Sequence, residues 1–150
     1  MRLQNLLAPL ETIAPLNLAA DWDNVGLLLG DAATDVRRVM TCLSVTPEVV
    51  AEATDQRADL IVTHHPILFS SVKQLTAASP EGRMVLTLAR FNVAVYSAHT
   101  AYDNAPGGIN DMIAARLQLG DVTPLRKRSL IESWNSLRKM KHSARSRPRR

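Results

Sequence analysis

Two adjacent histidines, His64 and His65, are the residues whose types and spacing most directly suggest chemistry. They follow the apolar run at residues 60–62, which is typical of a buried strand, and precede a second apolar patch at residues 67–69. Ligands of open α/β sheets bind outside the carboxyl ends of the strands, and neutral imidazole is a common transition-metal ligand. The pair is therefore a candidate start of a metal site, with an ordinary surface turn as the alternative.

A second histidine segment follows another strand-like run. Residues 93–97 lead into His99, and Asp103 comes four positions later. Because neighbouring parallel strands place their carboxyl ends on one side of a sheet, we expect this segment to meet the histidine pair, although 34 positions separate His65 from His99. Three imidazoles and a carboxylate suit Zn, Fe, Mn, Co or Ni rather than Ca or Mg. The alternative is a polar rim held by hydrogen bonds.

An alternation of strands and helices must position these residues. Strand-like runs lie between helical patterns, and Thr46 and Pro47 form a typical helix start. Nearly continuous apolar strands joined through helices predict an α/β fold, a mainly parallel sheet with helices on both faces. The expected elements are a helix at 3–13, a short strand at 26–30, a strand at 39–45, a helix from 46, a strand at 58–63, a loop at 66–80, a helix from 80 to 91, a strand at 93–97, a loop at 98–108 and a helix at 109–119.

Two local details of this scheme are open to test. In the last helix we expect Ile113, Ala114 and Leu117 to face inwards, and Gly120 to mark the end. Residues 22–24 (Trp-Asp-Asn) read either as a turn capped by the acid and the amide or as a loop lining a site, and spacing alone favours the turn.

Composition and charge limit the class of protein. A chain of 150 residues suffices for one domain, and no apolar run reaches the roughly 18 residues needed to cross a bilayer. We see no secretory signal, and the single cysteine, Cys42, is interpreted as a small buried hydrophobe. We therefore expect the protein to be located in the reducing cytoplasm. No Walker-type or dinucleotide glycine loop and no recognisable Ser or Cys nucleophile set is present.

The net charge of +4 hides a division of the chain into two parts. Residues 1–125 hold 8 Lys and Arg against 13 Asp and Glu, a net charge of −5. Residues 126–150 hold 10 Lys and Arg and one acid, a net charge of +9. The pI near 9.7 therefore reflects the basic tail, and it does not indicate a nucleic-acid-binding surface on residues 1–125.

Five segments resemble, in order, the NIF-three-like family (NGG-one-interacting factor three), whose members also carry the name GTP cyclohydrolase 1 type 2 homologue. The pairing of His-His-Pro with His-Thr-x-x-Asp is the specific part of the resemblance. The five segments are residues 22–27, 42–50, 59–69, 99–103 and 105–111.

The resemblance implies an α/β fold with a dinuclear metal centre, usually in a ring-shaped hexamer. It implies that His64 and His65 supply ligands to the two metals, that Asp103 is a third ligand, and that His99 lies at or beside the centre. The cofactor would be a divalent transition metal, up to two per chain. The cyclohydrolase name implies opening of the guanine ring by metal-activated water, and metal-dependent hydrolysis of an unnamed small molecule is the broader inference.

The sequence departs from the family after residue 120. The family's later half brings a His-x-x-x-Glu ligand pair, whereas His142 is followed at that spacing by Ser146. We therefore read residues 1–125 as an incomplete first half of the family domain and 126–150 as a basic tail. We expect weaker metal binding than in a full-length relative and little hydrolase activity.

Three interpretations of the tail remain open. The interpretation that we favour is an out-of-frame or rearranged end. The second is a basic extension that contacts nucleic acid or an acidic partner. The third is a basic helix followed by disorder at 141–150. A non-catalytic interaction protein is thus the alternative function, and we expect a homo-oligomer in either case. The helix reading rests on an apolar stripe at Leu130, Trp134, Leu137 and Met140.

Overall fold

The computed structural model describes residues 1–124, so the predicted basic tail lies outside the described residues. The chain divides into two compact units, Met1–Ile113 and Ala114–Arg150. The sheet and the candidate site both belong to the first unit. In the described part, no helix combines the length and apolar character required to span a bilayer.

A four-stranded sheet forms the centre of the first unit, in the order β1-β4-β3-β2. The three strands β2, β3 and β4 are parallel, which confirms the predicted α/β class, whereas β1 pairs antiparallel with β4 at one edge. The antiparallel pairing was not predicted. The strands are β1 (Gly26–Leu29), β2 (Val39–Cys42), β3 (Leu60–Thr63) and β4 (Ala94–Ser97).

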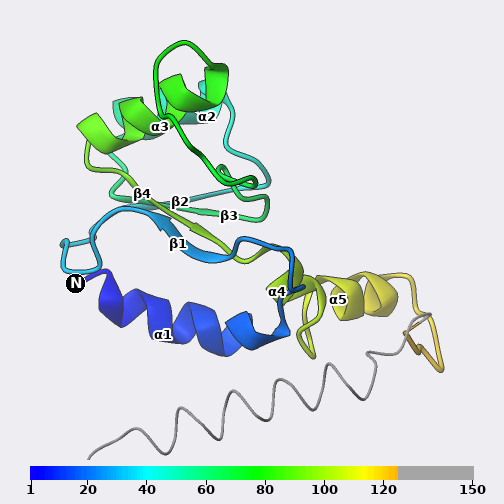
Figure 1. Ribbon diagram of the computed structural model, residues 1–150. Helices are drawn as coiled ribbons and strands as arrows, with labels where there is room; N and C mark the ends of the chain where they lie inside the picture. Colours follow the sequence, from blue (N-terminus) through cyan, green and yellow to red (C-terminus); the bar gives the residue numbers. More distant parts are fainter. Residues whose placement is uncertain (125–150) are drawn as a thin grey trace, which may run out of the picture. The chain divides into compact units, whose positions relative to one another are not determined.

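Helices cover both faces of this sheet, as the pattern predicted (Figure 1). Helix α1 lies on one face, and α2 and α3 lie together on the other (Figure 1). Thr46 and Ser79 cap α2 and α3 by accepting hydrogen bonds from backbone amides, and each cap is followed by a proline. The helices are α1 (Gln4–Ile13), a 3-10 turn η1 (Leu16–Leu18), α2 (Pro47–Asp55), α3 (Pro80–Arg90), α4 (His99–Asp103) and α5 (Ile109–Arg116).

Alternating strand residues build one core on each face of the sheet. Ile61 and Val95 pack toward α2 and α3, together with Val85 and Leu88. Leu60 and its neighbours on β4 face the other way, toward the leucines of α1. Strand β2 stays half-buried because it is the open edge of the sheet, and Cys42 at its end is likewise half-buried rather than buried.

Three local predictions were wrong. Residues 99–103 form the short helix α4 instead of a loop. Helix α5 ends at Arg116, before Gly120, because Gln118 takes a positive φ of 55° and the amides of residues 118 and 119 bond back to the carbonyls of 115 and 114. The expected inward face is also reduced to Ala114, since Ile113 and Leu117 are exposed.

Candidate metal centre

The carboxyl ends of β3 and β4 bring the two histidine segments together. The strands are in register, with Thr63 opposite Ser97. Beyond the strands, the backbone amide of His99 still donates to the carbonyl oxygen of His64, at 3.1 Å. The Ser97 hydroxyl donates to the same carbonyl at 2.7 Å. The positions of the two segments are therefore determined by backbone pairing.

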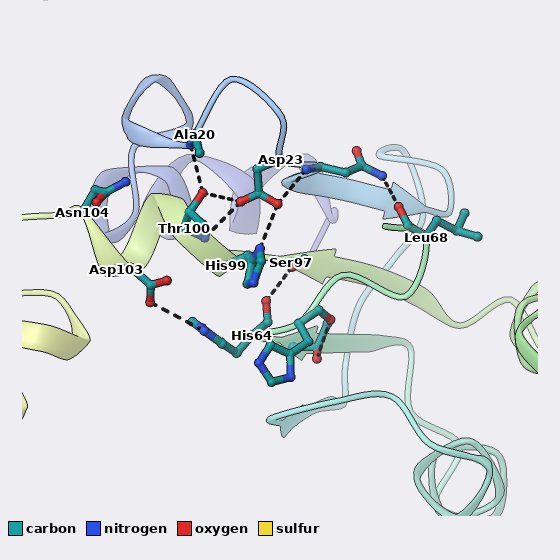
Figure 2. Close-up of polar contacts among 12 residues, drawn as sticks. Ala20, Asp23, His64, Leu68, Ser97, His99, Thr100, Asp103 and Asn104 are labelled. Atoms are coloured by element: carbon teal, nitrogen blue, oxygen red, sulfur yellow. Dashed lines mark hydrogen bonds and ion pairs between the residues drawn. The ribbon is translucent and has the colours of Figure 1, made fainter. Parts of the chain in front are cut away.

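Three imidazoles and a carboxylate converge at this edge of the sheet (Figure 2). His64, His65 and His99 each offer a ring nitrogen, and these three atoms lie within 4.8 Å of one another. Asp103 Oδ1 lies 3.6 Å from His64 Nε2. The structure thus brings together all four residues that the sequence singled out, while their role as metal ligands remains a prediction.

These distances suit metal ligands better than direct hydrogen bonds. Zinc–nitrogen and zinc–oxygen bonds of about 2.0–2.2 Å place two ligands of one tetrahedral ion about 3.3 Å apart. The 3.6 Å between His64 Nε2 and Asp103 Oδ1 is close to that value and long for a hydrogen bond. The three ring nitrogens lie within 4.8 Å of one another, which is wider than the spacing in an occupied site but close enough for the group to be one that could hold a transition-metal ion.

Asp23, from the loop before β1, fixes the ring of His99. Its Oδ1 accepts a hydrogen bond from His99 Nδ1 at 2.8 Å, and its other oxygen accepts from the backbone amide and hydroxyl of Thr100 (Figure 2). A carboxylate can only accept here, so the proton of a neutral His99 ring sits on Nδ1. The lone pair of Nε2 is left for a metal, an arrangement common beside metal ligands.

The hydrogen bonds to Asp23 keep it ionised despite burial of its side chain. Burial by itself raises the pKa of Asp23, but hydrogen bonds from Thr100, His99 and the Asn24 amide outweigh it and lower the pKa below its ordinary value. A charged Asp23 is the form that stabilises the Nδ1 proton of His99.

His65 has a partner of a different kind. Ser44, in the loop after β2, places its hydroxyl 2.7 Å from His65 Nδ1. A hydroxyl donates or accepts, so Ser44 orients the ring without specifying its tautomer. His65 is the exposed member of the three histidines.

The electrostatics of His64 favour the neutral form of its ring. Burial lowers the pKa of His64, and this effect exceeds the opposing influence of the Asp103 carboxylate. A metal ligand must be unprotonated, so this direction assists binding.

Two exposed aromatic side chains border the centre. The ring of Trp22 lies 5.9 Å from that of Phe69 and 6.3 Å from that of His99, between centroids. Both rings are more than half exposed, at 65% and 52%. The Trp-Asp-Asn segment therefore lines the site, which was the less favoured of its two interpretations.

Sequence reasoning missed two positioning residues, Asp23 and Ser44. The first had a signal in the Trp-Asp-Asn segment, interpreted as a capped turn. No sequence signal pointed to Ser44, because a serine after a strand is common and its partner, His65, lies 21 positions away.

Known proteins are similar to this chain in sequence and in fold. A model of the Duf34/NIF3 (NGG1p interacting factor 3) family matches residues 1–146, and the chain therefore belongs to this family. It is 41% identical over 120 residues to the GTP cyclohydrolase 1 type 2 homolog of Listeria innocua, covering 80% of this chain and 32% of that protein. The homolog of Clostridium perfringens is 39% identical over 113 residues, covering 75% of this chain and 43% of that protein.

A solved structure has a similar fold. A Bacillus cereus protein related to NIF3 superposes with a TM-score of 0.79 and 32% identity, covering 86% of this chain and 36% of the other. The chain thus spans less than half the length of these relatives.

Proposed function

We propose that the chain binds a divalent transition-metal ion at the carboxyl ends of β3 and β4. The observation that carries the proposal is the convergence of three imidazole nitrogens within 4.8 Å, with a carboxylate 3.6 Å from one of them. Mixed nitrogen and oxygen donors of this kind suit Zn, Fe, Mn, Co or Ni. The proposed ligands are His64, His65, His99 and Asp103.

A metal-dependent hydrolysis is the reaction that this centre suits best. A divalent ion held there would supply activation of water for attack on a small-molecule substrate. Asp23 and Ser44 would orient the rings of His99 and His65, and Trp22 with Phe69 would border the substrate. Support comes from the names of the relatives, which are GTP cyclohydrolase 1 type 2 homologs.

We further propose that activity is weak in this chain. Four ligands complete one tetrahedral ion but leave a second ion poorly held, and a catalytic ion needs an open position. Two tightly bound metal ions per purified chain would contradict this part of the proposal.

Elemental analysis of the purified chain tests metal binding. We expect about one transition-metal ion per wild-type chain and loss of the ion in His65→Ala, because imidazole is a strong metal ligand. His142→Ala removes the fourth histidine, which belongs to the tail, and is the matched control that should keep the ion. A folded wild type without metal after supplementation would contradict the proposal. The oligomer mass, recorded alongside, tests the expected homo-oligomer.

A binding function of the tail is the second candidate, favoured by the charge of residues 126–150. Ten Lys and Arg against one acid give this segment a net charge of +9, which suits nucleic acid or an acidic protein. Salt-dependent binding of a DNA duplex that disappears on deletion of 126–150 would support this function. Persistence of such binding in His65→Ala would separate it from the metal centre.

A further inference from the structure

Three consecutive residues, Trp22, Asp23 and Asn24, connect the metal centre to an exposed aromatic pair. Asp23 orients a proposed metal ligand, while the side-chain amide of Asn24 donates to the carbonyl oxygen of Leu68. That bond holds the backbone next to Phe69, whose ring centroid lies 5.9 Å from that of Trp22, with the ring planes 64° apart. The loop that orients a ligand therefore also builds the aromatic pair.

The two rings lie against the metal centre and stay open to solvent. The centroid of the His99 ring lies 6.3 Å from that of Trp22 and 6.2 Å from that of Phe69. Exposed apolar side chains that are scattered singly need no explanation, whereas a pair gathered beside a proposed catalytic centre is a candidate ligand surface. A planar ring stacked on Trp22 would thus be next to an ion that His99 helps to hold.

The charges around the centre select against an anionic substrate. Burial lowers the pKa of His64, and the charged groups that also act on it are Asp103, Asp23 and the two other imidazoles, with no Lys or Arg of residues 1–124 among them. The two carboxylates together would balance one divalent ion, so a loaded centre offers a phosphate chain no surplus positive charge.

The cations of the first unit gather at the opposite edge of the sheet. Residues Met1–Ile113 contain seven Lys and Arg, and four of them directly precede parallel strands. Arg37 and Arg38 precede β2, Arg57 precedes β3 and Arg90 precedes β4. Because these strands are parallel, the four arginines belong to the amino edge of the sheet, whereas the histidines follow the carboxyl ends. The fold thus separates most of its positive charge from the metal centre.

We propose that the substrate of the metal centre presents a planar, electron-poor aromatic ring without negative charge, and that this ring stacks on Trp22 beside Phe69. Among side chains, the face of Trp attracts a cationic group most strongly. The assignment rests on the proposed metal function for its chemistry, but two side chains that are not ligands recognise the ring. Such a substrate differs from the triphosphate in the name of the relatives, GTP cyclohydrolase 1 type 2 homolog.

Three probes that share a pyridine ring and differ in charge test the site in the full chain. At pH 7, 1-methylnicotinamide is a cation, nicotinamide is neutral and nicotinate is an anion. Trp134→Phe removes the other tryptophan, so the remaining indole N–H signal in ¹H–¹⁵N spectra reports on Trp22 alone. We expect saturable shifts of this signal, with a Kd that rises about two- to fivefold at each step from cation to neutral ring to anion.

Matched variants locate the ring, with binding measured by saturation transfer to the probe. Trp22→Leu keeps an apolar side chain without an aromatic face, so each Kd should rise about fivefold or more. Trp22→Phe should keep part of the affinity and the order of the three probes. Asn24→Ala releases the loop of Phe69 and should weaken binding less than Trp22→Leu does. Phe91→Leu is the control, since Phe91 is 61% exposed but precedes β4 at the amino edge of the sheet.

His65→Ala separates this proposal from the metal centre. The variant loses a proposed ligand and neither aromatic ring, so it should lose the ion and keep the order of the three Kd values. Because no ion is then present to coordinate the nicotinate carboxylate or the nicotinamide ring nitrogen, the order in this variant reflects the protein alone. Wild type that binds no metal but binds the cation through Trp22 would support ring recognition while contradicting the proposed metal function.

Three results would overturn the proposal. One is the absence of saturable 1-methylnicotinamide binding to folded wild type. Another is a Kd for nicotinate equal to or below that for nicotinamide in His65→Ala. The third is a set of Kd values that Trp22→Leu leaves unchanged, which would place the bound ring elsewhere on the chain.

Discussion

Asp23 Oδ1 lies 2.8 Å from His99 Nδ1, although 76 positions separate the two residues in the sequence. The Asp23 side chain is fully buried, and the amides of Asn24 and Thr100 also donate to its carboxylate. These contacts within the chain therefore determine both the direction and the tautomer of a neutral His99 ring. Such preorganisation reduces the entropy lost when a ligand ring is fixed on an ion.

The first prediction concerns this pair. Asp23→Asn keeps the shape of the side chain but removes the charge that stabilises the Nδ1 proton of His99. We expect metal affinity to fall about 10- to 100-fold, the usual effect of losing a carboxylate behind a ligating histidine. Competition with a chromophoric chelator measures the affinity. Asp21→Asn, an exposed acid of the same loop, is the control, and equal affinities in the two variants would show that Asp23 has no such role.

The second prediction concerns Ser44, which orients His65. Removing the hydroxyl in Ser44→Ala leaves His65 Nδ1 without its protein partner. We expect a loss of metal affinity smaller than for Asp23→Asn, because a neutral hydrogen bond is roughly half as strong as a charge-assisted one. The same chelator assay applies, with the exposed Ser71→Ala as control. A loss larger than that of Asp23→Asn would contradict the ranking.

The sequence predicted the elements of the site better than its contacts. Apolar runs and helix starts located all three parallel strands, and parallel pairing brought His64 and His99 together as expected. Periodicity carries no information about which loop packs against a histidine from 76 positions away, so the Asp23 contact was not predictable. The antiparallel pairing of β1 was also not predicted. The direction of a strand at a sheet edge depends on the path of the connection that leads to it, and periodicity carries no information about that path.

Residues 98–108 show a second kind of limit. A short segment rich in Asn, Pro and Gly predicts a loop, yet five residues of it form α4. This helix is too short to be stable alone, and it depends on tertiary contacts such as the amide of Ala20 bonded to the Thr100 hydroxyl at 2.9 Å. Contacts of that kind override local preference.

The third prediction follows from the raised pKa of Tyr96. Between pH 10, its ordinary pKa, and about 12, the unfolded chain loses the phenol proton while the folded chain keeps it. Ionisation then stabilises the unfolded state, so the free energy of unfolding falls as pH rises through this window. Tyr96→Phe lacks this group, and its stability relative to wild type should therefore increase from pH 8 to pH 11.

Urea unfolding at the two pH values measures this difference. Tyr102→Phe is the matched control, since its ring is half-buried and its hydroxyl already bonds Met112. At pH 8 we expect Tyr96→Phe to be at least as stable as wild type, because the removed hydroxyl has no partner. A parallel pH dependence in wild type and Tyr96→Phe would contradict the assigned pKa direction.

The fourth prediction concerns Gly82, in the first turn of α3. By helix propensity alone, Gly82→Ala should stabilise the helix by about 1 kcal/mol. An added Cβ would, however, lie 1.9 Å from the carbonyl oxygen of Thr76 and 3.0 Å from the Ser79 hydroxyl that caps the helix. Since the Thr76 oxygen belongs to the backbone, the loop must shift, and we expect a net loss of about 1–3 kcal/mol.

Thermal and urea unfolding measure the change, with Gly120→Ala as the control, because a Cβ there meets no atom within 4 Å. The control should change stability by less than about 0.5 kcal/mol. If Gly82→Ala is as stable as wild type or more stable, the loop before α3 can move away from the added Cβ at little cost in free energy. A loss as predicted would mean that contact with this loop, and not intrinsic helix propensity, determines which residue is tolerated at position 82 of α3.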